Sequence, residues 1–162
     1  RVLCEAWSLV ERRSRGMELH VVGIERHSRD DVNAQGRVIF HGRQAAIEIA
    51  KLHRQCTLFV LPSLMDNSPN ALVEAMASGM PCVASDAGGI PSLLRHGETG
   101  WIVPAGDAMA LAEAILRLLA DRDLMCRLGA AANAEVQNNR PSVVAEETVR
   151  IYRSIVAGEP TV

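Results

Sequence analysis

Two carboxylates, Asp66 and Glu74, flank a short polar loop near the middle of the sequence and are separated by seven residues. Asp66 lies just before a predicted helix, and Glu74 lies in the second turn of that helix. A carboxylate can accept two hydrogen bonds from a vicinal diol, so one of the pair could hold a ribose and the other a sugar ring. The alternative is structural: Asp66 caps a turn and Glu74 is a solvated residue on the helix surface.

The start of this helix offers a site for an anion. Pro69 is predicted to occupy the first helical position, which leaves the backbone N–H groups of Asn70 and Ala71 free. A helix N-terminus presents such donors with about half a positive charge, which suits a diphosphate without a metal ion or a lysine. Asn67 and Ser68, in the loop itself, are further candidate substrate-binding residues.

A second loop, Ser85–Pro91, also ends a predicted strand and opens a helix, and its glycines Gly88 and Gly89 would let a ligand approach the backbone closely. The pair is equally consistent with an ordinary glycine turn. His41 and Gly42 end another predicted strand, at a sheet edge where nucleotide bases dock. The alternative for His41 is a plain surface or core histidine.

The segments between these loops alternate between strand and helix patterns. The apolar run Thr57–Leu61 is unbroken by polar residues, which is typical of a parallel strand buried on both faces. The alternation predicts an α/β fold, a Rossmann-like doubly wound parallel sheet with helices on both faces and ligands at the carboxyl ends of its strands. The predicted strands are 18–23, 37–42, 57–61, 81–85 and 100–104, and the predicted helices are the opening segment before Gly16, 45–55, 69–78, a short one after Gly89, one capped by Asp107, 124–137 and 142–156.

The length of 162 residues fits one domain, which we expect to span residues 1–157 with a frayed tail at 158–162. Apolar residues make up 48% of the chain and aromatic residues only 3%, so its core must be aliphatic. The last predicted helix should pack on this core through one apolar stripe. That stripe consists of Val144, Thr148, Ile151 and Ile155.

Charge and metal-binding residues exclude several classes of function. The net charge is −2 and no Lys/Arg run occurs, so we expect no contact with nucleic acid. The histidines are scattered without metal-ligand spacing, so we expect no metal site. The four cysteines lack paired spacing and are predicted to be buried free thiols in a reducing cytoplasm. No apolar stretch is long enough for a signal peptide or a transmembrane helix, so the domain should be soluble.

Together, several of these segments resemble the large family of retaining GT-B glycosyltransferases, which transfer sugars from nucleotide donors. The resemblance is carried by Val60–Ser63, Glu74–Ser85, Gly88–Pro91 and Gly97–Pro104, followed by Asp107 and the helix from Leu111 to Leu119. These segments cover almost the whole chain in the family's order. The resemblance implies the C-terminal, nucleotide-sugar-binding half of a GT-B fold, with the acceptor held by an N-terminal domain of the same full-length chain.

The resemblance also implies roles for the site residues. The family carries two acidic residues separated by seven others, as Asp66 and Glu74 are. Carried over, Asp66 would contact the transferred sugar and Glu74 the ribose hydroxyls, while the amides of Asn70 and Ala71 would bind the diphosphate. The family also places a turn and a base-binding loop near this pocket, and these correspond here to Gly88, Gly89, His41 and Gly42.

Three substitutions and one absence depart from the family pattern. Asp66 stands where glutamate is usual and is shorter by one methylene, Asn67–Asn70 replaces a commoner glycine-rich loop, and Ser92 stands where an acid is common. Family members begin this domain with a central strand that carries an arginine and a Lys-Gly pair for the donor phosphates, and nothing before Arg1 supplies it. We therefore expect a piece of a longer protein or a truncated form, inactive alone and prone to self-association across the gap.

The resemblance implies that the chain binds a nucleotide-diphosphate sugar, without a metal cofactor, for transfer of a hexose-type sugar to a sugar or lipid-linked acceptor. The enzyme would be cytoplasmic, with attachment to the inner face of the membrane left open through the absent half. Two alternatives remain. One is a GT-B epimerase or hydrolase that acts on the nucleotide sugar, and the other is a non-catalytic Rossmann-like module for assembly or regulation.

Overall fold

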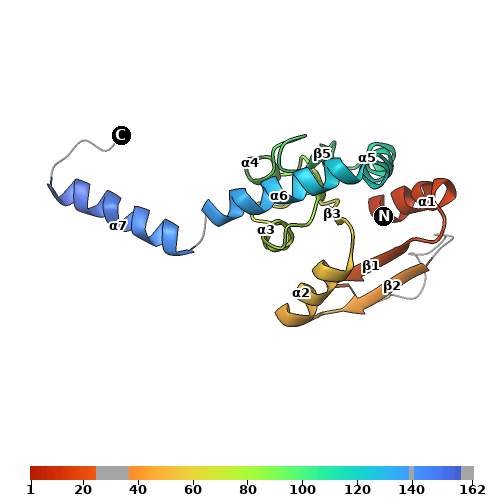
Figure 1. Ribbon diagram of the computed structural model, residues 1–162, viewed down its shortest axis with the longest axis horizontal. Helices are drawn as coiled ribbons and strands as arrows, with labels where there is room; N and C mark the ends of the chain where they lie inside the picture. Colours follow the sequence, from red (N-terminus) through yellow and green to blue (C-terminus); the bar gives the residue numbers. More distant parts are fainter. Residues whose placement is uncertain (25–36, 139–140, 158–162) are drawn as a thin grey trace.

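The computed structural model describes residues 1–24, 37–138 and 141–157 of the chain (Figure 1). Each element that the sequence predicts is present, with slightly shifted bounds. In chain order the elements are α1 (Val2–Arg13), β1 (Glu18–Val22), β2 (Arg37–Gly42), α2 (Ala46–Gln55), β3 (Phe59–Leu61), α3 (Asn70–Ala77), β4 (Cys82–Ser85), α4 (Ile90–Leu93), β5 (Trp101–Val103), α5 (Ala108–Ala120), α6 (Arg122–Asn138) and α7 (Pro141–Ala157).

All strand pairs are parallel, as predicted, but they form two hydrogen-bonded sheets. One sheet has the order β1-β2 and the other the order β3-β4-β5. No ladder joins β1 to β3 within the described residues. The expected single sheet is therefore divided in two, while the α/β class and the parallel strand direction agree with the sequence analysis.

A cavity of about 300 Å³ lies between β1 and β3. Leu19 of β1 and Val60 of β3 line it, and helices α1 and α5 contribute Trp7 and Ile115. The indole Nε1 of Trp7 is buried and finds no hydrogen-bond partner in the described part of the chain. The cavity lies where the family resemblance predicts a central strand.

The core has two parts, one on each side of β4, whose four residues are all buried. Val83 packs among side chains of α1, α5 and α6, whereas Cys82 and Ala84 pack among side chains of α3 and α4. Successive strand residues point to opposite faces, so one short strand holds together two layers of helices. This is the doubly wound arrangement that the sequence predicts.

The predicted burial of β3 on both faces is wrong. Phe59, Val60 and Leu61 are each only half-buried, whereas β4 is buried throughout. The difference follows from position, because Val60 borders the cavity while β4 has a strand on either side.

The four cysteines are free, as predicted, but only one of them is buried. Cys82 lies in the core, and burial raises the pKa of its thiol to about 12. Cys4 and Cys56 are half-buried, and burial also raises the pKa of Cys56. Cys126 is exposed on α6, which corrects the expectation of four buried thiols.

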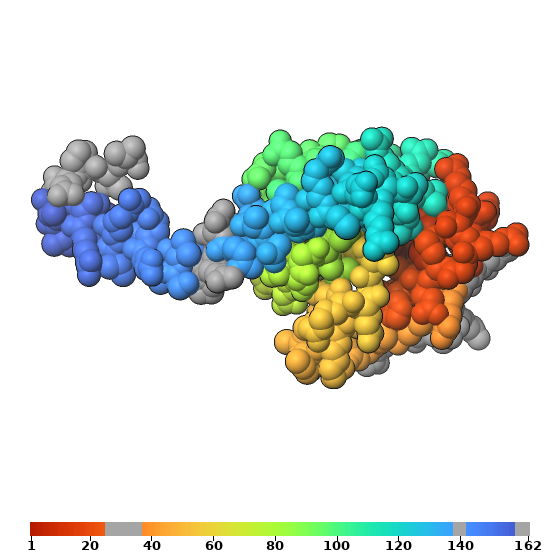
Figure 2. Space-filling model, in the orientation of Figure 1, coloured from red at the N-terminus to blue at the C-terminus, as the bar shows by residue number. Residues whose placement is uncertain are grey.

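The C-terminal helix α7 projects away from the body (Figures 1 and 2). Val144, Ile151 and Ile155 are exposed, and Thr148 donates only to the carbonyl of Val144 within the helix. The predicted packing of this stripe on the core is therefore wrong for the described chain. None of the described helices is long and apolar enough to cross a membrane.

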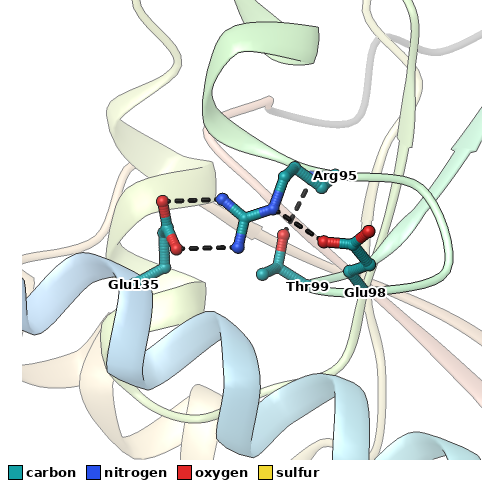
Figure 3. A network of polar contacts seen from close by, with 4 residues as sticks. All are labelled: Arg95, Glu98, Thr99 and Glu135. Carbon is teal, nitrogen blue, oxygen red and sulfur yellow. Dashed lines mark hydrogen bonds and ion pairs between the residues drawn. The ribbon is translucent and has the colours of Figure 1, made fainter.

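An arginine fastens the turn between α4 and β5 to helix α6 (Figure 3). The guanidinium of Arg95 donates two hydrogen bonds to Glu135, at 2.8 and 2.9 Å, and one to Glu98, at 2.9 Å. The backbone N–H of Arg95 donates to the buried hydroxyl of Thr99 at 2.9 Å. These contacts join the segment that follows the glycine pair to helix α6.

Candidate functional site

Adjacent strands β3 and β4 deliver two candidate loops to the same edge of their sheet. Leu61, the last residue of β3, is in register with Ala84 of β4. The chain therefore leaves both strands side by side, as loop 62–69 and loop 86–89. These are the loops that the sequence analysis singles out for chemistry.

The glycine pair packs directly against the backbone of the Asp66 loop. The N–H of Gly89 donates to the carbonyl oxygen of Asp66 at 2.9 Å. A Cβ added to Gly88 would lie 2.4 Å from that oxygen, and a Cβ added to Gly89 would lie 2.4 Å from the carbonyl oxygen of Asn67. No side chain fits at either position, so the two predicted loops are brought into contact and glycine is required there.

The carboxylate of Asp66 takes part in a local turn. Its Oδ1 accepts a hydrogen bond from the N–H of Ser68 at 3.2 Å, and the side chain is half-buried. This is the turn-capping role that the sequence left open as an alternative. A carboxylate has several lone pairs, so this one bond leaves capacity for a hydroxyl of a ligand.

Helix α3 begins one residue later than predicted, which changes its anion site. Pro69 is the N-cap rather than the first helical residue. The N–H of Asn70 donates to the carbonyl of Ser68 at 2.9 Å, so this amide is not free. The N–H of Ala71 donates to no acceptor within the described residues. One of the two predicted amides therefore remains available, together with the partial positive charge of the helix terminus.

Glu74 lies on the second turn of α3, as predicted, and it is exposed. Its charge acts on a histidine that the sequence did not connect to the site. His53 of α2 contacts the hydroxyl of Ser78 at 3.2 Å. Burial lowers the pKa of His53, and the negative charge of Glu74 opposes this effect. Helix α2 therefore adjoins the helix that carries Glu74.

His41 and Gly42 belong to the other sheet, and no ladder joins them to the Asp66 loop. Nε2 of His41 lies 2.9 Å from Nδ1 of His20, and Nε2 of His20 lies 3.4 Å from the carboxylate of Glu18. His41 is therefore held by a neighbour on β1 that sequence spacing alone did not indicate. Within the described residues, no cluster of three His, Cys, Asp or Glu side chains could hold a metal ion.

Two polar residues at the end of β4 were also missed from the sequence. The hydroxyl of the buried Ser85 donates to the carbonyl of Ser63 at 2.6 Å, and Asp86 accepts from the N–H of Ala105 at 2.7 Å. The sequence did carry a signal for Ser85 and Asp86, because they are polar residues at the end of an otherwise apolar strand. Such residues lie at the ligand-binding edge of a parallel sheet.

A sequence model of the family described as glycosyl transferases group 1 matches residues 1–121. The chain belongs to this family. A glycosyltransferase relative is the N-acetyl-alpha-D-glucosaminyl L-malate synthase of Bacillus anthracis, which is 31% identical over 127 residues, or 78% of this chain and 33% of that protein. The chain thus spans about a third of the length of this relative.

Solved glycosyltransferases have the same fold. Sucrose-phosphate synthase from Thermosynechococcus elongatus superposes with a TM-score of 0.79 at 29% identity, over 98% of this chain and 43% of that one. HepE from Anabaena, solved in complex with UDP and glucose, superposes with a TM-score of 0.67 at 28% identity, over 75% of this chain and 33% of that one. The structural neighbours are GT-B glycosyltransferases, which confirms the predicted fold class.

Proposed function

We propose that this chain binds the nucleotide-diphosphate-sugar donor of a retaining glycosyltransferase. The observation that carries the proposal is the packing of Gly88 and Gly89 against the Asp66–Asn67 backbone, next to the start of α3. This packing gathers a carboxylate, a free amide and a helix terminus at the carboxyl ends of two adjacent parallel strands, where such sheets bind ligands. Family membership and the complex of HepE with UDP and glucose support a nucleotide sugar as the ligand.

Each group has a role in the proposed complex. Asp66 accepts hydrogen bonds from the transferred sugar and Glu74 accepts them from the ribose. The amide of Ala71 and the positive end of α3 bind the diphosphate, so we propose that no metal ion is needed for this charge. Asn70 contributes through its side chain, because its backbone N–H is already engaged. The remaining proposed donor contacts are Asn67, Ser68, Gly88, Gly89, His41 and Gly42.

Catalysis in this proposal rests on holding the donor and stabilising the leaving diphosphate. The sugar, of hexose type, passes to a sugar or lipid-linked acceptor that is bound by an N-terminal domain of the full-length protein. The chain alone is therefore expected to bind donor without transferring its sugar. We also propose that the open edges of β1 and β3 favour self-association of the isolated chain.

Calorimetric titration of the purified chain with UDP, GDP and ADP tests the proposal. We expect one nucleotide to bind, and Glu74→Ala to weaken its binding about tenfold or more, because a charged hydrogen bond to the ribose is lost. Glu113→Ala, which removes another exposed carboxylate from α5, should leave the affinity unchanged. Absence of binding by all three nucleotides, or equal effects of the two substitutions, would contradict a donor site at α3.

A further inference from the structure

Ser85 is a buried polar residue at the carboxyl end of β4, and its side chain reaches the neighbouring loop. It is 1% exposed, and its hydroxyl donates to the carbonyl of Ser63 at 2.6 Å. The two residues are 22 positions apart in sequence. A buried hydroxyl of this kind fixes the backbone that it contacts, because the loss of the bond would leave a carbonyl without a partner.

Between Ser63 and Asp66, the loop after β3 is held through its backbone. Ser85 holds it at Ser63, and the N–H of Gly89 holds it at the carbonyl of Asp66. Leu64 and Met65, the two residues between these points, are 69% and 83% exposed, so their side chains add little packing. Both fixed points come from the β4–α4 segment.

We propose that Ser85 is a positioning residue that sets the place of the Asp66 carboxylate relative to the N-terminus of α3. Asp66 lies three residues after the carbonyl that Ser85 fixes, and the second fixed point is its own carbonyl oxygen. A shift of about 1 Å in a group that holds a substrate can reduce its effect a hundredfold. The effect on sugar binding rests on the proposed donor-binding function. The effect of Ser85 on the position of the loop does not depend on that function.

A structural role for Ser85 predicts something different. If the bond served only the stability of the fold, its loss would lower the global free energy of unfolding without a specific effect on the Asp66 loop. Thr99 is the matched control, since it is also 1% exposed and its hydroxyl accepts a bond of 2.9 Å from Arg95 without touching the Asp66 loop. Thr99→Val removes that bond, Ser85→Ala removes the one proposed here, and Ser85→Thr keeps a hydroxyl in place.

The first measurement is backbone amide hydrogen exchange of the ligand-free chain at Ser68 and Gly89, whose N–H groups donate to the carboxylate and to the carbonyl oxygen of Asp66. We expect exchange there to be about fivefold or more faster in Ser85→Ala, unchanged in Thr99→Val and restored in Ser85→Thr. If Ser85→Ala leaves these amides unchanged, or Thr99→Val accelerates them equally, Ser85 does not position the loop. This arm needs no ligand and stands even if the chain binds no nucleotide.

The second measurement compares the affinities of UDP, GDP and ADP with those of UDP-glucose, GDP-mannose and ADP-glucose. Because Asp66 is proposed to contact only the sugar, Ser85→Ala should weaken the binding of the nucleotide sugar about fivefold and leave that of its nucleoside diphosphate unchanged. Equal weakening of both would indicate a general structural role and overturn the inference. Failure of wild type to bind any of the six would reject the proposed function and leave the exchange experiment to decide the inference.

Discussion

Gly88 and Gly89 allow the Asp66 loop to pack closely against them, because neither residue has a side chain. The carbonyl oxygens of Asp66 and Asn67 occupy the space that a Cβ would need, at 2.4 Å in each case. This close packing also lets the N–H of Gly89 donate a hydrogen bond to the carbonyl oxygen of Asp66. The glycines therefore act on the candidate carboxylate through its backbone, in addition to any contact with a ligand.

Gly88→Ala should displace the Asp66 loop and lower the free energy of unfolding by about 1–3 kcal/mol more than a matched control, because overpacking against backbone cannot relax cheaply. The control is Gly16→Ala, since Gly16 shares the positive φ, 87° against 55°, but has nothing within 4 Å of its Cβ position. Urea unfolding measures both variants. Equal destabilisation would show that φ strain, rather than the contact with Asp66, accounts for the effect.

The ion pair of Arg95 and Glu135 predicts a dependence of stability on pH. Hydrogen bonding to Arg95 holds the pKa of Glu135 below its usual value of 4.5, and Glu135 raises the pKa of Arg95 in turn. A lowered carboxyl pKa stabilises the fold above the unfolded pKa, and this stabilisation is lost as the pH falls through the folded pKa.

Glu135→Gln should therefore lower the unfolding temperature at pH 7, and the difference from wild type should shrink as the pH falls below about 4.5. Thermal unfolding from pH 7 to pH 3 measures this difference. Glu98→Gln serves as the control, because that carboxylate makes one bond to Arg95 rather than two and is 70% exposed. A difference that persists unchanged at pH 3 would rule out the carboxylate charge as its source.

At the scale of elements, helices α6 and α7 contribute very differently to the fold. Leu128 and Ala132 of α6 are fully buried, whereas the apolar residues of α7 are exposed. The two helices have the same length of 17 residues. The free energy of unfolding should therefore depend on α6 and change little when α7 is removed.

Truncation after Asn138 should leave the unfolding temperature within about 2 °C of that of the whole chain, as expected for loss of exposed groups. Truncation after Asp121 removes the buried side chains of α6 as well and should abolish cooperative unfolding. Differential scanning calorimetry of the two shortened chains measures both effects. A large loss of stability on removing α7 alone would mean that its apolar face is covered in solution.

The elements could be predicted from the sequence because periodicity records which faces are buried. The alternation of strands and helices was predicted from this periodicity, and the Asp107 cap on α5 was predicted from a local sequence signal. The bond from Ser85 to Ser63 could not be predicted, since it depends on two loops meeting in space. The free amide at Asn70 was predicted wrongly for a related reason: Pro69 became the N-cap, and a tight turn placed the carbonyl of Ser68 within reach.

At the scale of the whole molecule, the two sheets differ in burial. All four residues of β4 are buried, whereas β1, β2 and α2 contain no fully buried residue. The β1–β2 sheet joins the rest mainly through side chains that meet those of α1 and α5. Regions with few buried contacts open more readily than the core does.

Amide hydrogen exchange of the whole chain should therefore divide the molecule into two regions. We expect protection in β4 to exceed protection in β2 by about tenfold or more, because β2 can open without disturbing the other sheet. Leu58→Ala, in the cluster that the two sheets share, should increase this difference. Equal protection in the two strands would mean that the cavity between the sheets does not separate them energetically.

The cavity also limits how the open strand edges can be used by other molecules. An unpaired strand edge offers a template on which a strand of another chain can pair. Here the edges of β1 and β3, unpaired within the described residues, border one partly open cavity, whose walls include Trp7 and Ile115. Because side chains of α1 and α5 wall this cavity, we expect it to admit a single extended strand more readily than another folded sheet. These two edges should therefore take up one strand and then be closed, which makes them self-terminating sites rather than starting points for a fibre.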